Sequence, residues 1–106
     1  MTRFNGAVAL VTGAGSGIGA AVARRLTSDG AVVAALDIDL GAASATVEAL
    51  GRGGAFTADV ADSRAVDAAV EDVERTLGPI ELVAHAAGID ADRGLKQRLA
   101  EHRREL

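Results

Sequence analysis

Four glycines lie in the stretch Thr12–Gly19, whose sequence is Thr-Gly-Ala-Gly-Ser-Gly-Ile-Gly. Backbone N–H groups can hold a pyrophosphate only where the chain approaches it closely, and side chains would obstruct that approach. Gly13, Gly15 and Gly17 remove the obstruction, and the start of the following helix adds partial positive charge. We expect Gly19, one turn into that helix, to let the helix pack tightly on a sheet. A tight turn without a ligand is the alternative, but four glycines in this position favour a nucleotide-binding loop.

An acidic residue, Asp37, follows eighteen positions after Gly19, at the end of an apolar run. A carboxylate at this place can accept hydrogen bonds from both hydroxyls of an adenosine ribose, and it would repel a 2′-phosphate. Neither the glycine-rich stretch nor the neighbourhood of Asp37 contains a Lys or Arg that could bind such a phosphate. These features favour NAD over NADP. The alternative is that Asp37 or Asp39 caps the next helix, which fits Asp39 better than Asp37.

Four apolar runs alternate with three stretches of helical spacing, and these elements must position the glycines and Asp37. Strands are predicted over residues 7–11, 31–36, 55–58 and 80–86. Apolar residues three or four positions apart indicate helices between the strands. These residues are Ile18, Val22 and Leu26, then Leu40, Ala43, Val47 and Leu50, then Val66, Ala69, Val70, Val73 and Leu77. Asp62 is placed to cap the third helix.

This alternation predicts an α/β fold of the three-layer Rossmann type. We expect a partial parallel sheet of four strands in the order 3-2-1-4, with helices on both faces. The predicted nucleotide-binding half-domain covers residues 1–89. Residues 90–106 form a charged tail, in which Leu95, Leu99 and Leu106 indicate a C-terminal helix.

The composition excludes several classes of function. Hydrophobic residues make up 49% and charged residues 25%, as in an ordinary globular protein, and the net charge is -4. This charge disfavours nucleic acid and anionic membranes as partners. The sequence has no cysteine and two histidines, which excludes disulfides, thiolate metal sites and histidine-based metal clusters. Because we find neither a signal peptide nor a membrane span, we expect a cytoplasmic protein.

Taken in order, these motifs resemble the short-chain dehydrogenase/reductase family. Thr12, Gly13, Gly17 and Gly19 match the family's Thr-Gly-x-x-x-Gly-x-Gly loop, residue for residue. Asp37 matches the acidic residue that marks the NAD-preferring members. The resemblance covers residues 4–89, and within it residues 30–89 are similar to the 2,3-dihydro-2,3-dihydroxybenzoate dehydrogenases.

Two further motifs carry the resemblance. Asp59–Val60 matches the pair that the family places against the adenine ring. Residues 80–89 look like the family's fourth strand and its Asn-Asn-Ala-Gly motif, with His85 and Ala86 in place of the asparagines. The resemblance implies an oxidoreductase that transfers a hydride between NAD and a secondary alcohol or carbonyl. It assigns cofactor contacts to Gly13, Gly15, Ser16, Gly17, Ile18, Gly19, Asp37, Ile38, Asp59, Val60, Ala86, Ala87 and Gly88.

The catalytic groups of the family are not found in this sequence. Family members carry an active-site asparagine, a serine and Tyr-x-x-x-Lys beyond the region of resemblance, but here there is no tyrosine and the sole lysine is Lys96. A missing general acid or base typically costs about 10²–10⁴ in rate. His85, at a strand end, fits a structural role better than a proton shuttle. We therefore assign no catalytic residue, expect a truncated chain that is inactive alone, and leave its status as an enzyme open.

Two alternatives to an oxidoreductase portion stay open. One is a nucleotide-binding or regulatory module that acts through a partner, and the other is a non-functional gene fragment. The predicted strand order also makes the fourth strand an edge that is apolar on both faces, and such an edge tends to pair with another chain. We therefore expect self-association through this edge and the tail helix.

Overall fold

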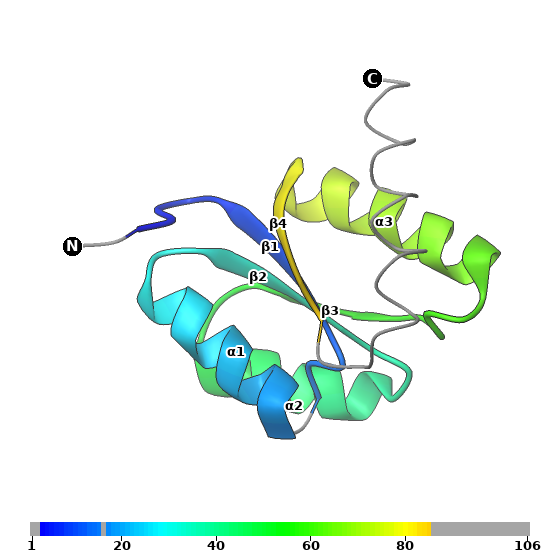
Figure 1. Cartoon of the computed structure of the whole chain (residues 1–106), viewed down its shortest axis with the longest axis horizontal. Helices are drawn as coiled ribbons and strands as arrows, with labels where there is room; N and C mark the ends of the chain where they lie inside the picture. Colours follow the sequence, from blue (N-terminus) through cyan, green and yellow to red (C-terminus); the bar gives the residue numbers. More distant parts are fainter. Residues whose placement is uncertain (1–2, 16, 86–106) are drawn as a thin grey trace.

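The computed structural model describes residues 3–15 and 17–85, which contain four strands and three helices. Their bounds are β1 (Val8–Thr12), α1 (Gly17–Ser28), β2 (Val32–Asp37), α2 (Leu40–Leu50), β3 (Gly54–Thr57), α3 (Ser63–Leu77) and β4 (Ile80–His85). All three strand pairs are parallel, and the sheet has the order β3-β2-β1-β4 (Figure 1). This arrangement confirms the predicted fold and strand order. The ends of β1, β2 and β3 differ from the predicted ones by one residue, β4 begins at Ile80 as predicted, and its predicted last residue, Ala86, lies outside the described residues. The predicted C-terminal helix lies outside the described residues.

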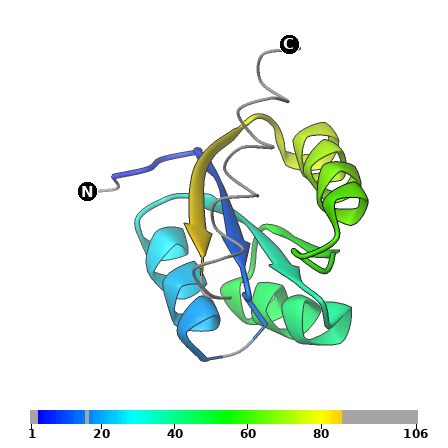
Figure 2. The same cartoon turned by 45° about the vertical axis from the view of Figure 1, so that its right-hand side comes forward.

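The helices cover both faces of the sheet. Figure 2 shows α1 and α2 side by side on one face and α3 on the other. The α3 face has a core of larger side chains, which includes Leu10, Leu36, Phe56, Val66, Val70 and Val73. The face under α1 and α2 is built from smaller ones, namely Val11, Ala14, Ala23, Val33, Ala35 and Ala43. Because small side chains permit close approach, α2 comes near enough to contact the segment that follows β1.

The register brings the carboxyl ends of the strands to one edge of the sheet. Thr12, the last residue of β1, is aligned with Leu36 of β2 and with His85 of β4. Asp37 at the end of β2 is aligned with Thr57 of β3. The chain leaves β1 towards α1 on one face, whereas α3 returns to β4 on the other. The β1–β4 boundary is therefore the point at which α/β sheets of this type bind ligands.

Aspartate caps fix the starts of two helices. Asp39 accepts a hydrogen bond from the N–H of Ala42 at 3.1 Å and begins α2. Asp62 accepts from the N–H groups of Arg64 and Ala65 and begins α3, as predicted. These contacts confirm the capping interpretation for Asp39 and leave Asp37 available for another role.

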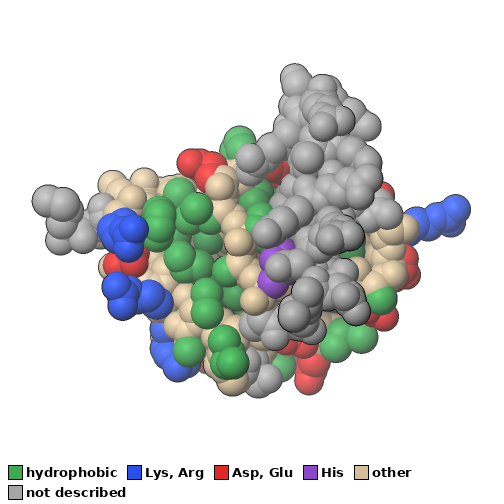
Figure 3. Space-filling view, viewed as in Figure 1, with side chains coloured by type: hydrophobic (Ala, Val, Ile, Leu, Met, Phe, Trp, Pro, Cys, Tyr) green, Lys and Arg blue, Asp and Glu red, His purple; other side chains and the backbone are tan. Residues whose placement is uncertain are grey.

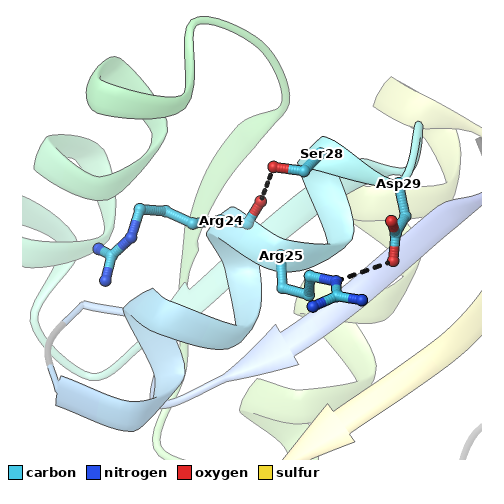
Figure 4. Close-up of polar contacts among 4 residues, drawn as sticks. All are labelled: Arg24, Arg25, Ser28 and Asp29. Atoms are coloured by element: carbon cyan, nitrogen blue, oxygen red, sulfur yellow. Dashed lines mark hydrogen bonds and ion pairs between the residues drawn. The ribbon is translucent and has the colours of Figure 1, made fainter.

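The outer side of α1 carries exposed residues. Figure 3 shows hydrophobic side chains clustered on the side of the molecule that contains α1. Lys or Arg side chains lie at the outer edge of this cluster. Ile18, although part of the apolar spacing that marks α1, is 76% exposed, while Gly19 and Ala23 face the interior. Near the end of the helix Arg25 pairs with Asp29 at 3.3 Å, and the Ser28 hydroxyl donates to the Arg24 carbonyl (Figure 4).

None of the helices in the described part of the chain has the length and apolar character required to cross a membrane.

Candidate functional site

The glycine-rich loop joins β1 to α1 and turns sharply at the edge of the sheet. Gly13 and Gly17 both have positive φ, at 66° and 56°. A Cβ added at Gly19 would lie 1.9 Å from the carbonyl oxygen of Gly13, so no other residue fits there without displacing the loop. The tight packing expected at Gly19 is thus present, but its nearest neighbour is the backbone of the loop rather than the sheet.

Asp37 is hydrogen-bonded to this loop. Its Oδ2 accepts from the N–H of Gly15 at 2.9 Å, and its Oδ1 accepts from the N–H of Asp39 at 3.0 Å. The side chain is half-buried. Because each carboxylate oxygen can accept more than one hydrogen bond, both oxygens keep capacity for a hydroxyl group of a ligand. The loop and the acidic residue, predicted separately from the sequence, therefore meet in one place.

A pocket of about 160 Å³ opens beside Asp37, between the carboxyl ends of β2 and β3. Its lining residues are Gly13, Leu36, Asp37, Ile38, Ala58, Asp59 and Val60. Leu36 and Ala58 give it a buried apolar floor, while Asp59 is exposed and accepts a hydrogen bond from the N–H of Ala61 at 2.9 Å. An apolar slot with carboxylates at its rim suits a flat ring that carries polar groups.

The structure brings most of the predicted cofactor residues together. Gly13, Asp37, Ile38, Asp59 and Val60 line the same pocket. Gly15 is bonded to Asp37, and Gly17, Ile18 and Gly19 form the first turn of α1 beside the loop. The remaining four predicted residues, Ser16, Ala86, Ala87 and Gly88, lie outside the described residues.

His85 is linked to the strand that leads into the loop. Its Nδ1 lies 3.1 Å from the Oγ1 of Thr12 and is hydrogen-bonded to it. Thr12 is fully buried, so this contact joins the carboxyl ends of β1 and β4 inside the fold. The geometry agrees with the structural role favoured for His85.

Sequence reasoning missed two residues of α2 that contact the loop. The hydroxyl of Thr46 donates a hydrogen bond to the carbonyl of Ala14 at 2.9 Å, and Thr46 is 8% exposed. Ala42, one turn earlier, lies where any side chain at Gly15 would have to go, 2.5 Å from the position of its Cβ. The signal that could have found Thr46 is a polar residue beside Ala43 and Val47 on the apolar side of the predicted helix.

No cluster of three metal-ligating side chains occurs within residues 3–15 and 17–85. The site is instead marked by backbone N–H groups, by the apolar pocket and by the aspartates that follow β2 and β3. These groups offer hydrogen bonds and apolar contact to a ligand.

Comparison with known proteins identifies relatives of this chain. The sequence pattern described as short chain dehydrogenase matches residues 7–105. A human protein named (3R)-3-hydroxyacyl-CoA dehydrogenase is 45% identical over 102 residues, which cover 85% of this chain and 39% of that protein. A Bacillus subtilis protein named 2,3-dihydro-2,3-dihydroxybenzoate dehydrogenase is 44% identical over 90 residues, which cover 81% of this chain and 34% of that protein.

The fold has relatives among solved structures as well. The crystal structure of a hydroxysteroid dehydrogenase from Escherichia coli matches with a TM-score of 0.84 and 25% identity, over 93% of this chain and 53% of that one. The chain thus spans about two fifths or less of the length of the two curated relatives. The resemblance seen in the sequence is confirmed. Because these two relatives have nearly equal identity and are named for different substrates, the likeness to the dihydroxybenzoate dehydrogenases selects no substrate.

Proposed function

This chain belongs to the short-chain dehydrogenase family, and we propose that its described residues bind the adenosine and diphosphate of NAD. In this proposal the pocket between β2 and β3 takes the adenine ring, Asp37 accepts hydrogen bonds from the ribose hydroxyls, and the glycine-rich loop faces the diphosphate. The observation that carries the proposal is the position of Asp37, which lines the pocket and accepts a hydrogen bond from Gly15 of the loop.

The residues present fit this cofactor. Leu36, Ala58 and Val60 offer apolar contact to an aromatic ring, and Asp37 stands at the rim, next to the loop. At Gly15 and Gly19 there is no room for a side chain, so the loop backbone keeps its close path around the start of α1. A helix N-terminus of this kind attracts anions through its unpaired N–H groups and its dipole.

We further propose that NAD is preferred over NADP. A 2′-phosphate would lie next to the carboxylate of Asp37, and the following Ile38 and Asp39 supply no positive charge. Like charges brought together in a partly buried site are unfavourable, so the phosphate would lose affinity relative to the free hydroxyl. The binding preference thus follows from one half-buried carboxylate.

The oxidoreductase chemistry of the family is supplied by nicotinamide, which exchanges a hydride with a substrate when the cofactor is bound. What the described residues of this chain contribute is binding and orientation. We propose that the substrate class is a secondary alcohol or carbonyl, and that these 106 residues alone give no turnover because they contain no tyrosine to act as the family's general acid. Incubation of the purified chain with NAD and secondary alcohols, followed at the absorbance of reduced nicotinamide, tests this; robust turnover would contradict it.

Titration calorimetry with NADH and NADPH tests the binding proposal directly. We expect NADH to bind at least tenfold more tightly than NADPH, since each factor of ten corresponds to about 1.4 kcal/mol. Asp37→Ala should weaken NADH binding and reduce the difference in affinity between NADH and NADPH. The matched control is Asp72→Ala, which removes an equal charge from an exposed side chain on α3. It should change neither the affinity for NADH nor the affinity for NADPH. Equal binding of NADH and NADPH by the unmodified chain would refute the role of Asp37.

We propose that the chain self-associates through the edge of β4 together with residues 90–106. Within the described sheet β4 pairs with β1 alone, and its Leu82 and Val83 are half-buried. An apolar edge strand favours pairing with a second copy. Light scattering over a concentration series should show a dimer or larger species, which Val83→Lys should weaken. A monomer at all concentrations would contradict the proposal.

A cytoplasmic location without nucleic acid or membrane partners completes the proposal. The net charge of -4 supports the absence of nucleic acid and anionic membranes as partners, because it disfavours binding to anionic surfaces. Cell fractionation and co-sedimentation with anionic vesicles test it, and recovery of the chain with the vesicles would contradict it.

A further inference from the structure

We propose that Thr46, a buried residue of α2, positions the glycine-rich loop for the dinucleotide. This inference rests on the proposed function, because it assigns to Thr46 an effect on cofactor affinity without any contact with the cofactor. Its basis is the hydrogen bond from the Thr46 hydroxyl to the Ala14 carbonyl, which joins residues 32 positions apart in the sequence.

The peptide unit between Ala14 and Gly15 is held at both ends. Its carbonyl oxygen accepts from Thr46 at 2.9 Å, and its N–H donates to Asp37 at 2.9 Å. The preceding N–H, that of Ala14, donates to the carbonyl of Leu36 at 3.2 Å. A peptide unit is planar, so fixing both its oxygen and its hydrogen fixes its rotation. Two side chains from different elements therefore set the direction in which the loop runs towards α1.

Helix α2 contacts the loop along one face. Ala42 and Thr46 are four residues apart, and residues at this spacing lie one above the other on a helix. The methyl group of Ala42 occupies the space beside Gly15, and Thr46 reaches Ala14. Asp39, the residue that caps this helix, donates its N–H to Asp37. The loop, Asp37 and α2 are thus joined to one another by hydrogen bonds and packing.

Loss of the Thr46 hydroxyl would leave a buried acceptor without this partner. Ala14 is fully buried, and an unsatisfied buried carbonyl is more costly than the hydrogen bond is favourable. Rotation of the peptide to find another partner would also turn the Gly15 N–H away from Asp37. The carboxylate proposed to receive the ribose and the loop proposed to face the diphosphate would both lose their fixed positions.

Thr27 provides a matched control on the neighbouring helix. It lies in α1, it is half-buried, and within the described part of the chain its buried hydroxyl oxygen makes no hydrogen bond. Thr27→Val therefore makes the same chemical change as Thr46→Val without removing a contact to the loop. Thr46→Ser keeps the hydroxyl and removes only a methyl group.

Calorimetric titration of these three variants with NADH tests the inference. Thr46→Val should weaken NADH binding about tenfold, the scale of one buried hydrogen bond, while Thr46→Ser should bind within about twofold of the unmodified chain. Thr27→Val should bind as the unmodified chain does. Equal affinity of Thr46→Val and Thr27→Val would overturn the inference. A loss of about tenfold in Thr46→Ser relative to the unmodified chain would also overturn it, because packing rather than the hydrogen bond would then be responsible. This comparison needs no Thr46→Val protein.

Hydrogen exchange of the Gly15 amide, followed by NMR without any ligand, separates this inference from the proposed function. Thr46→Val should raise the exchange rate of this amide about tenfold or more, because it frees the peptide unit that carries the amide. Thr27→Val and Thr46→Ser should leave the exchange rate unchanged. If the unmodified chain binds no NADH, the proposed function fails while the exchange rates still decide whether Thr46 fixes the loop. Unchanged exchange of Gly15 in Thr46→Val would overturn the positioning role whatever the cofactor result.

Discussion

Replacement of Gly19 by alanine places a methyl group where α1 meets the glycine-rich loop. The new Cβ would lie 1.9 Å from the carbonyl oxygen and 2.6 Å from the carbonyl carbon of Gly13, whereas real Cβ atoms almost never approach closer than 3.0 Å. The two groups must therefore separate by a further 1.1 Å or more. Because the neighbour is backbone, this movement cannot be absorbed by a change of side-chain rotamer.

The free energy of unfolding should fall despite a gain in helix propensity. Alanine is favoured over glycine within a helix by about 1 kcal/mol, and overpacking of a well-filled site costs about 1–3 kcal/mol. Gly41→Ala serves as a control that separates the overpacking cost from the gain in helix propensity. Gly41 also lies in the first turn of a helix, but its added Cβ would meet only the flexible carboxylate of Asp39, at 3.3 Å. We expect Gly19→Ala to be less stable than Gly41→Ala by about 1–3 kcal/mol, the cost of the clash alone.

Urea denaturation followed by circular dichroism measures this difference, since the chain has no tryptophan or tyrosine to report by fluorescence. Displacement of the loop by about 1 Å should also weaken NADH binding by about tenfold to a hundredfold, as for other misplaced binding groups. Gly41→Ala should leave NADH binding within about twofold of the unmodified chain. If Gly19→Ala is as stable as Gly41→Ala and binds NADH equally well, the close contact deduced from the structure is wrong.

Three further predictions concern the scaffold, all measured by urea denaturation. Asp62→Ala removes the cap of α3 and should cost about 1 kcal/mol, and Asp62→Asn should retain most of that amount; an equal loss in both would contradict the capping role. Val73→Ala leaves a cavity in the fully buried core under α3 and should cost about 1–3 kcal/mol, while a change below about 0.5 kcal/mol would contradict that packing. Arg25→Ala breaks an ion pair whose arginine side chain is 75% exposed and should change stability by no more than about 0.5 kcal/mol; a larger loss would show that the pair with Asp29 supports the end of α1.

The sequence by itself determined the elements and their order. Apolar runs of strand length alternate with helical spacing, and this local pattern sets α2 at Leu40–Leu50 and α3 at Ser63–Leu77 with their aspartate caps. Parallel strands joined by helices admit few topologies, so the strand order could be predicted as well. The glycine-rich loop and Asp37 were recognisable because steric freedom and charge are properties of the residue types themselves. The predicted cofactor contacts remain a prediction, although the fold places most of them together.

Only the tertiary structure decided which of these residues touch. The bond between Gly15 and Asp37 depends on the parallel register of β1 and β2, and the bond between Thr46 and Ala14 depends on how closely α2 packs on that face. The position of Thr46 on the apolar side of the predicted helix signals a buried hydroxyl, but it does not name the partner. A threonine on a helix has the same intrinsic propensities whatever acceptor its hydroxyl meets. Long-range contacts of this kind are fixed by packing, in which the small side chains under α2 determine its distance from the sheet. For the same reason Gly19, expected to pack on the sheet, proved to be required by the loop.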